Sequence, residues 1–386
     1  MSDQTKIGGF FSKAFNLPAL KKSRLYWVDY LKGIAIILVV YRHSLLGIQG
    51  SGVLTPAYLE NANMIFFSFR MPLFFMLSGI FASISLRKRT VQQYIAAKFE
   101  TLMYPYFIWV TIQITLQIAL SGFTNSNRGL IDYTYIFYQP RNLDQFWYLP
   151  ALFNATVVYI LIKKYITQTW WLLIAVGLGF YFLSPYLQSV SMLSDFMEFF
   201  IFFALGDVIS NLFFHESAQA FLKKYLTLLV AIPFFVAAQI YYLSHDMYYQ
   251  TTALMRAEFL IIALVGCFTM LALSFRLQCW NIFSWLRILG YHSIYIYVMH
   301  VMIAALTRNF LTHILGVHNI YIILFSCIVA GGFLPIIIYN LLIHDNVLWF
   351  LFAWKRKKIT PQIKEATHKP TPVVSTSAQN YPLNYK

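Results

Sequence analysis

Residues able to do chemistry gather in one apolar stretch near the start of the chain, from Tyr26 to Gly47. The stretch is long enough to cross a bilayer, since a transmembrane helix needs about 20 mostly apolar residues. A charged side chain in hydrocarbon costs several kcal/mol, so ionisable groups at that depth usually face a protein-lined cavity and mark function. Four ionisable residues interrupt the stretch: Asp29, Lys32, Arg42 and His43.

Lys32 and His43 are spaced so that they share one face of the predicted helix. A helix turns about 100° per residue, so eleven positions give three turns plus about 20° and an axial separation of about 16 Å. One face would then carry a cation near its end and an imidazole deep in the membrane. A simpler alternative places Asp29 and Lys32 at the lipid headgroups, because lysine near a helix end extends easily into water, and makes His43 a packing residue. Arg42 points about 100° away from His43, and the pattern gives it no role.

The composition is that of an all-α integral membrane protein. Of the 386 residues, 59% are hydrophobic and 11% are charged, whereas soluble domains have about 25% charged residues. The net charge of +15 could indicate nucleic acid, but the lysines and arginines cluster between apolar runs, as the positive-inside rule expects. We therefore expect membrane lipids as partners and no nucleic acid. The first apolar run starts late and is long, which is not typical of a cleavable signal.

The sequence does not indicate a metal or cofactor site of the common kinds. The three cysteines, Cys267, Cys279 and Cys327, have no paired spacing. The sequence contains no HExxH motif, Walker loop or dinucleotide-binding fingerprint. We therefore expect no metal and no permanently bound cofactor.

About ten transmembrane helices are predicted from the apolar runs, with both termini in the cytoplasm. In this topology the cytoplasmic loops and tails hold most of the 29 lysines and arginines, and the outer loops hold few. We expect a basic cytoplasmic segment over residues 1–25, a transmembrane domain over 26–350, and a basic, disordered tail over 351–386. The predicted spans cover residues 28–48, 63–86, 101–121, 146–162, 169–185, 195–214, 225–243, 257–275, 286–306 and 319–343.

Three ionisable residues from three spans are predicted to lie at one depth. His43, Arg70 and His300 each lie about five to seven residues from the outer end of their span, and a helix rises about 1.5 Å per residue. A shared polar cavity explains this best, because each group would otherwise need its own solvation. A neutral histidine can take a hydroxyl proton, an arginine can stabilise an oxyanion, and Lys32 could bind a phosphate or carboxylate from the cytoplasm. This layout fits acyl transfer across a membrane, and it also fits an ion or proton pathway.

Other residues indicate close packing around this site. Ser78 and the glycine after it permit close helix approach, and packing alone would account for the pair. Trp147 opens the fourth span at the outer interface, where an aromatic belt is an alternative explanation. Glu198 and Asp207 lie inside the sixth span, so each needs a partner or a cavity.

Four stretches together resemble the membrane acyltransferase-3 family of bacterial multi-span O-acyltransferases. They occur in the family's order across nearly all of the membrane part. The first has a basic residue, ten others and then a histidine, here Lys32 and His43. The last has Ser293, Tyr297 and His300 at the family's spacing. The four stretches are DYLKGIAIILVVYRH, FRMPLFFMLSGIF, FWYLPALF and LGYHSIYIYVMH.

The resemblance implies a ten-helix acyltransferase core in the inner (cytoplasmic) membrane. It implies transfer of an acyl group, usually acetyl from cytoplasmic acetyl-CoA, to a hydroxyl of a cell-envelope carbohydrate or its lipid-linked precursor. His43 then takes the general-base or acyl-relay role, and Lys32 takes the donor side. We place His43, Arg70 and His300 at the catalytic centre, with supporting roles for Asp29, Ser78, Trp147, Ser293 and Tyr297.

One departure from the family lies at the entry to the third span, where the family often has two arginines three positions apart. Here Lys98 occupies the first position and Thr101 the second, so one charge is lost. We assign Lys98 to donor binding, with Arg87, Lys88 and Arg89 as candidates to compensate. Because no SGNH-type domain follows the last span, a second transfer step would need a partner protein.

Two other functions fit the same sequence. A transporter or flippase for a polysaccharide or its lipid-linked unit would also use intramembrane charges, although no inverted repeat or energy-coupling domain is visible. A non-catalytic membrane partner of a synthase complex is the third interpretation. The sequence leaves open the acceptor, the acyl chain, and whether the acyl group moves directly or through His43.

Overall fold

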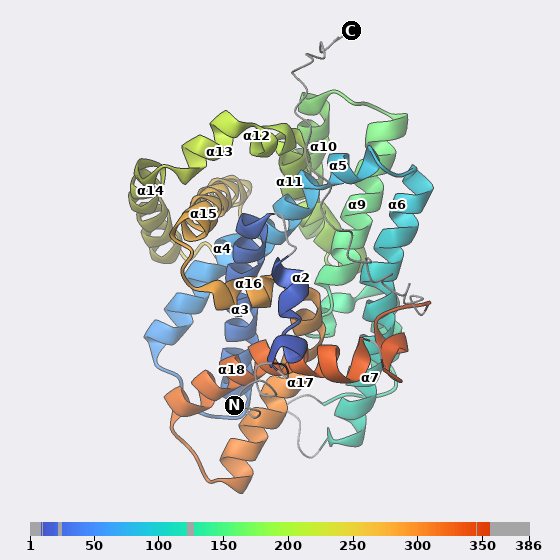
Figure 1. Ribbon diagram of the computed structural model, residues 1–386, viewed down its shortest axis with the longest axis vertical. Coiled ribbons are helices and arrows are strands. Elements are labelled where there is room, and N and C mark those ends of the chain that lie inside the picture. The colour runs from blue at the N-terminus through green and yellow to red at the C-terminus, as the bar shows by residue number, and fades with distance from the viewer. Residues whose placement is uncertain (1–8, 10, 22–24, 122–126, 345, 356–386) are drawn as a thin grey trace, which may run out of the picture. The chain divides into compact units, whose positions relative to one another are not determined.

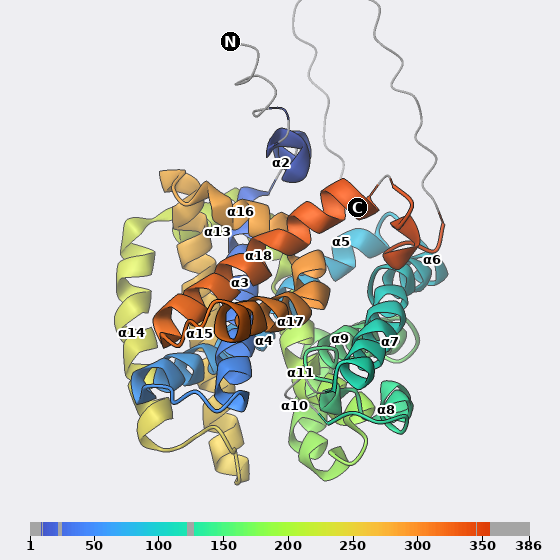
Figure 2. The same cartoon turned by 90° about the horizontal axis from the view of Figure 1, so that it is seen from below.

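The computed structural model describes residues 9, 11–21, 25–121, 127–344 and 346–355, and Figures 1 and 2 show them from two sides. Every regular element of these residues is helical. The α-helices are α2 (Leu17–Lys21), α3 (Tyr26–Gly50), α4 (Ala57–Ile80), α5 (Ala82–Leu86), α6 (Val91–Lys98), α7 (Tyr104–Ala119), α8 (Asp132–Tyr138), α9 (Tyr148–Tyr165), α10 (Trp170–Leu183), α11 (Ser191–Val208), α12 (Ser210–Phe214), α13 (Glu216–Lys223), α14 (Tyr225–Ser244), α15 (Ala253–Trp280), α16 (Ser284–Tyr291), α17 (Ser293–Asn309) and α18 (Ile320–Ile338).

Short π-helical and 3₁₀ turns continue or connect these helices. The π-helical turns join α6 to α7 and extend the ends of α17 and α18, and the 3₁₀ turns lie mainly in connections. Their bounds are Phe99–Met103, Phe310–Ile314 and Tyr339–Ile343 for the π-helical turns, and Pro140–Asn142, Ser184–Leu187 and Trp349–Leu351 for the 3₁₀ turns.

Eight helical segments of the described chain are long and apolar enough to cross a membrane. They contain α3, α4, α6 with α7, α10, α14, α15, α17 and α18. The chain is therefore an all-α, multi-pass membrane protein. The two other predicted spans coincide with α9 and α11, which have 18 residues each; α11 carries Asp195, Glu198 and Asp207. The total of ten spans and the cytoplasmic termini stay predictions.

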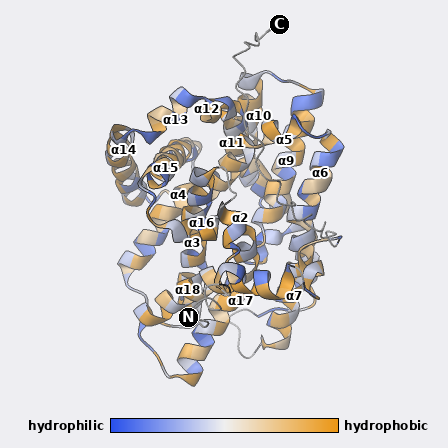
Figure 3. Ribbon diagram, viewed as in Figure 1, coloured by the Kyte–Doolittle hydropathy of each residue, from blue (hydrophilic) through white to orange (hydrophobic). Residues whose placement is uncertain are grey.

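Apolar side chains cover the surface of the outlying helices. On α14, Leu226, Phe234 and Ile240 are each more than 60% exposed. In Figure 3 hydrophobic colours run along the long helices, and hydrophilic residues gather near connections such as α12 and α13. A soluble protein rarely exposes so much contiguous apolar surface, whereas a lipid-facing helix requires it.

Helix α3 is the centre of the packing. It contacts α4, α15, α16, α17 and α18, and Figures 1 and 2 both show it between the α14–α15 pair and the group that contains α9 and α11. Thirteen of its residues are buried, Trp27 and Asp29 among them. Residues of α3 are therefore within reach of several other helices, which is what a shared site on this helix requires.

The ninth predicted span, residues 286–306, is wrong as a single helix. It is divided at His292 into α16 and α17. The cause is the close packing of α16 on α3 at two glycines. A Cβ atom at Gly33 would lie 2.0 Å from the carbonyl oxygen of Leu286, and one at Gly290 would lie 1.8 Å from that of Asp29. This backbone contact draws α16 across α3 before α17 begins.

The predicted close approach at Gly79 is confirmed. Helix α4 meets α11 there, because a Cβ at Gly79 would lie 2.0 Å from the oxygen of Phe203, and one at Gly206 would lie 2.1 Å from that of Met76. Asp207 follows directly, and it forms an ion pair with Lys163.

The acidic residues of α11 have protein partners. Asp207 also accepts hydrogen bonds from Ser83 and from the Tyr159 hydroxyl at 2.7 Å. Glu198 lies 3.6 Å from Arg141, whose Nε donates to Asp195 at 2.7 Å. Glu198 and Asp207 were each predicted to need a partner or a cavity, and these contacts supply the partners. They give the acidic residues a structural role.

The described part of the N-terminal segment packs on the helical domain. Ala14 is buried and its carbonyl accepts a hydrogen bond from Asn340 at 2.9 Å. The Phe15 ring lies edge-on to Phe333 at 6.2 Å. The predicted tail over 351–386 falls almost wholly outside the described residues, as do parts of the segment over 1–25.

Candidate active site

The structure brings together the three residues predicted to share one depth. The ring centres of His43 on α3 and His300 on α17 lie 5.1 Å apart, with the rings nearly perpendicular at 66°. Arg70 on α4 is 2% exposed and lies close enough to His43 to act on it electrostatically. A polar centre formed by three helices is therefore present inside the apolar bundle.

His300 has its two ring nitrogens in different surroundings. Nδ1 lies 3.0 Å from the carbonyl oxygen of Ile296 and 2.8 Å from that of Tyr297. Because carbonyls only accept hydrogen bonds, Nδ1 carries the proton of the neutral ring and Nε2 carries the lone pair. Nε2 is buried and has no hydrogen-bond partner among the described residues. A buried acceptor of this kind is ready to take a hydrogen bond from His43 or from a substrate.

Two arginines lie within electrostatic range of His43 and make different contacts. Arg70 donates from Nη1 to the carbonyl of Leu38 at 3.2 Å and to Oδ1 of Asn63 at 3.4 Å. Arg42 lies 5.6 Å from the ring centre of Phe67 and has no hydrogen bond or ion pair with any described residue. Both cations lack a carboxylate partner among these residues, so they can stabilise an anion that forms or binds near His43.

A cavity of about 540 Å³ opens beside His43. Its walls come from the C-terminal parts of α3, α7 and α17, from the connection before α9 and from Cys327 of α18. Its volume is in the range of small-molecule sites, roughly 300–1,000 Å³. The lining residues are Arg42, His43, Ser44, Leu46, Gly47, Gly50, Gln113, Leu116, Gln117, Leu120, Asp144, Val301, Met302, Ala304, Ala305, Leu306, Arg308, Asn309 and Cys327.

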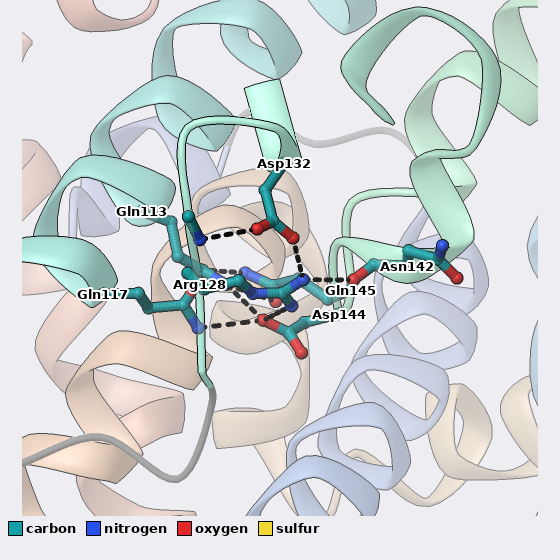
Figure 4. Close-up of polar contacts among 8 residues, drawn as sticks. Gln113, Gln117, Arg128, Asp132, Asn142, Asp144 and Gln145 are labelled. Atoms are coloured by element: carbon teal, nitrogen blue, oxygen red, sulfur yellow. Dashed lines mark hydrogen bonds and ion pairs between the residues drawn. The ribbon is translucent and has the colours of Figure 1, made fainter. Parts of the chain in front are cut away.

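A network of amides and charges forms one wall of this cavity (Figure 4). Asp144 Oδ2 accepts from Gln113 at 2.9 Å and from Gln117 at 3.1 Å, and lies 3.3 Å from Arg128. Arg128 also pairs with Asp132 at 2.9 Å. Burial acts to raise the pKa of Asp132, but the Gly129 N–H and Arg128 outweigh it and lower that pKa. The anionic Asp132 thus holds Arg128 against Asp144.

Tyrosines link this wall to the histidines. The Tyr297 hydroxyl donates to the backbone carbonyl of Gln145, whose amide donates to Gln113 at 2.8 Å. The Tyr297 ring lies 6.1 Å from His300 and 5.1 Å from Tyr148. Tyr297 therefore joins the connection before α9 to the helix that carries His300.

The other predicted supporting residues occupy different places. Ser78 lies within reach of the Tyr148 hydroxyl and so approaches the site through that tyrosine. Trp147 is covered by Arg141, 4.4 Å from its ring centre, and packs on Phe199. Ser293 starts α17, seven residues and thus about 10 Å from His300, so it is not brought to the histidines.

The predicted donor-binding residues meet near the opposite end of α3. Lys32 interacts electrostatically with Asp29, which is 7% exposed. Lys98 lies within electrostatic range of Lys32 and Arg89. The hydroxyl of Thr101 donates to the carbonyl of Ala97 at 2.9 Å. Lys98 thus has two other cations, Lys32 and Arg89, within electrostatic range.

Sequence reasoning missed the cavity wall and the position of Arg42. Gln113 and Gln117 are single amides in an apolar helix, and Asp144 lies in a connection where acidic residues are common. A helical spacing of four between the two glutamines was the available signal. Arg42 and His43 are 100° apart on α3, yet both reach the same cavity.

Comparisons with known proteins add one finding. A family model of the acyltransferase-3 type, described as an acyltransferase domain, matches residues 25–341. No curated protein and no solved structure matches the chain. Among the described residues, no group of three His, Cys, Asp or Glu side chains could hold a metal ion.

Proposed function

Because the chain belongs to the acyltransferase-3 family, we propose that it is an O-acyltransferase of the inner membrane. It moves an acyl group, acetyl in the first instance, from cytoplasmic acyl-CoA to a hydroxyl of a cell-envelope carbohydrate or its lipid-linked precursor. The observation that carries this proposal is the pairing of His43 with His300, 5.1 Å apart, beside a cavity of about 540 Å³.

The transfer step follows from the groups around His43. A ring nitrogen of His43 takes the proton of the acceptor hydroxyl while that oxygen attacks the thioester carbonyl. The tetrahedral oxyanion forms beside the cations of Arg42 and Arg70, which are favourable there because the surroundings have a low dielectric constant. The C–S bond then breaks, the CoA thiolate takes the proton from His43, and the products are an ester and CoA.

The donor is expected to approach from the end of α3 that carries Lys32. Lys32 and His43 are separated by about 16 Å along α3. An extended pantetheine arm could bridge that gap and bring the thioester to the histidine. Lys32, Lys98 and Arg89 would hold the phosphates of the donor, because phosphates bind most strongly where cations gather.

The test compares release of free CoA by the purified wild-type protein and by His43→Ala in liposomes, with acetyl-CoA as donor and an envelope glycan extract present. We expect His43→Ala to lower the rate by about 10²–10⁴-fold, the usual contribution of a general base. The matched control is His313→Ala, because His313 is exposed and does not line the cavity.

Equal rates for wild type and His43→Ala would remove His43 from the mechanism. No CoA release by either protein would favour the transporter or flippase interpretation. A second transfer step, onto an acceptor beyond the membrane, would call for a partner protein and would appear as activity restored by adding cell extract.

A further inference from the structure

We propose that the cavity beside His43 is the acceptor site and that it takes a glycolipid: a hydroxyl-bearing head group carried on an apolar chain. The inference rests on the proposed function and selects one of its two acceptor classes. In this arrangement the head group lies against Asp144 and Gln113, and the apolar chain leaves the cavity into the bilayer.

The polar wall offers an acceptor atom that the protein itself leaves unused. Asp144 Oδ2 is occupied by Gln113, Gln117 and Arg128. Oδ1 of the same carboxylate has no hydrogen-bond partner among the described residues, and the side chain is 32% exposed. A carboxylate oxygen fixed in this way accepts a hydrogen bond from a sugar hydroxyl with little loss of side-chain entropy, because three donors already hold the group.

Apolar residues form the mouth of the same cavity. Leu46, Leu116 and Leu306 line it and are 41%, 44% and 64% exposed. Each lies on a membrane-spanning helix, α3, α7 and α17 respectively, so the cavity presents apolar surface within the membrane-spanning part of the chain. A free polysaccharide would have to place polar surface against these leucines, which costs free energy without hydrogen bonds in return. An apolar chain instead gains about 0.8 kcal/mol for each buried CH₂ group.

The mouth lies where a lipid head group would be found. Gly50 ends α3 and Asn309 ends α17, and both line the cavity. These are the ends that the predicted topology places on the outer side. His43 lies about 10 Å from the end of α3, so a head group of one or two sugar rings spans from the interface to the histidine.

The first test uses the intact protein in proteoliposomes, labelled acetyl-CoA and two acceptor preparations from the same cells. One is the organic-solvent extract that contains envelope glycolipids, and the other is the water-soluble glycan released from it by mild acid. We expect the glycolipid fraction to be labelled at least about tenfold faster, which corresponds to about 1.4 kcal/mol of added binding.

Equal or faster labelling of the released glycan would overturn the glycolipid proposal. So would labelling of neither fraction while CoA release still depends on His43, and the proposed function would survive that result. If neither labelling nor CoA release occurs, the proposed function fails and this inference fails with it.

The second test uses substitutions to examine the polar wall that contains Asp144 and the apolar leucines of the cavity separately. Asp144→Ala should raise the KM for the glycolipid acceptor by about tenfold, the effect of one lost hydrogen bond of about 1.4 kcal/mol. Leu116→Ser should slow labelling of the glycolipid but not of the released glycan. Leu229→Ser is the matched control, because Leu229 is 50% exposed and does not line the cavity. An unchanged acceptor KM in Asp144→Ala, or equal losses in both leucine variants, would contradict the proposal.

Discussion

His300 is suited to positioning His43. Its Nδ1 proton is held by the carbonyls of Ile296 and Tyr297, so Nε2 can only accept a hydrogen bond. If that bond comes from an N–H of His43, the other nitrogen of His43 keeps its lone pair for the acceptor hydroxyl. The pair then works as a base and the group that orients it, an arrangement that recurs in nucleophilic catalysis.

Substitution of His300 tests this positioning role. In His300→Gln the amide oxygen can still accept from His43, whereas in His300→Phe nothing can accept. We expect the glutamine variant to keep about tenfold more activity than the phenylalanine variant, the equivalent of one hydrogen bond near 1.4 kcal/mol. The measurement is kcat for CoA release, with thermal unfolding of both variants recorded as a check on folding. Equal activities in two folded variants would show that His300 only packs.

Glycines at helix crossings decide how the elements that carry the site approach each other. Gly33 and Gly290 let α16 lie directly on α3, where a Cβ would come within 2.0 Å of a backbone oxygen. The clash is with backbone, so no side-chain rotation relieves it. Since α17 follows α16 after one residue, this contact also sets where His300 stands relative to His43.

Adding one methyl group at this crossing of α3 and α16 is expected to lower both the stability and the activity of the protein. Gly290→Ala should destabilise the fold by about 1–3 kcal/mol, the usual cost of overpacking, and lower activity by shifting α17. Gly179→Ala is the control, because a Cβ at Gly179 meets nothing within 4 Å and alanine favours the helix by about 0.8–1.0 kcal/mol. Thermal unfolding in detergent measures both. If the Gly290→Ala protein were as stable as Gly179→Ala, the close packing of α16 on α3 at Gly290 would be refuted.

The sequence predicted the elements better than their junctions. Runs of apolar residues placed the long helices, because the bilayer forces a length of about 20 residues on each. The break at His292 could not be predicted in this way, since it arises from tertiary contact between Gly290 and α3. His43, Arg70 and His300 were found because charge in an apolar run is costly and rare. Gln113 and Asp144 gave no such signal, as neutral amides and loop carboxylates are ordinary.

On the scale of the whole molecule, the proposed donor and acceptor sites lie toward opposite ends of α3. Lys32, near the first turns of α3, and Arg89 both act electrostatically on Lys98, and the cavity occupies the last turns of α3 from Arg42 to Gly50. His43 lies between them. A protein organised in this way would keep its two substrates in different compartments and let only the acyl group pass between them.

This separation predicts that donor-side substitutions change donor kinetics alone. Lys98→Ala should raise the KM for acetyl-CoA by about tenfold, since one charge-assisted contact contributes about 1.5–3 kcal/mol, while the KM for the acceptor stays the same. Lys98→Arg should restore donor binding, because it keeps the charge and matches the residue that the family often has there. Lys224→Ala, an exposed lysine at the end of α13, is the control for a general effect of lost charge. If Lys98→Ala raised the acceptor KM as strongly as the donor KM, the two sites would not be separate, and donor and acceptor would have to bind in one compartment.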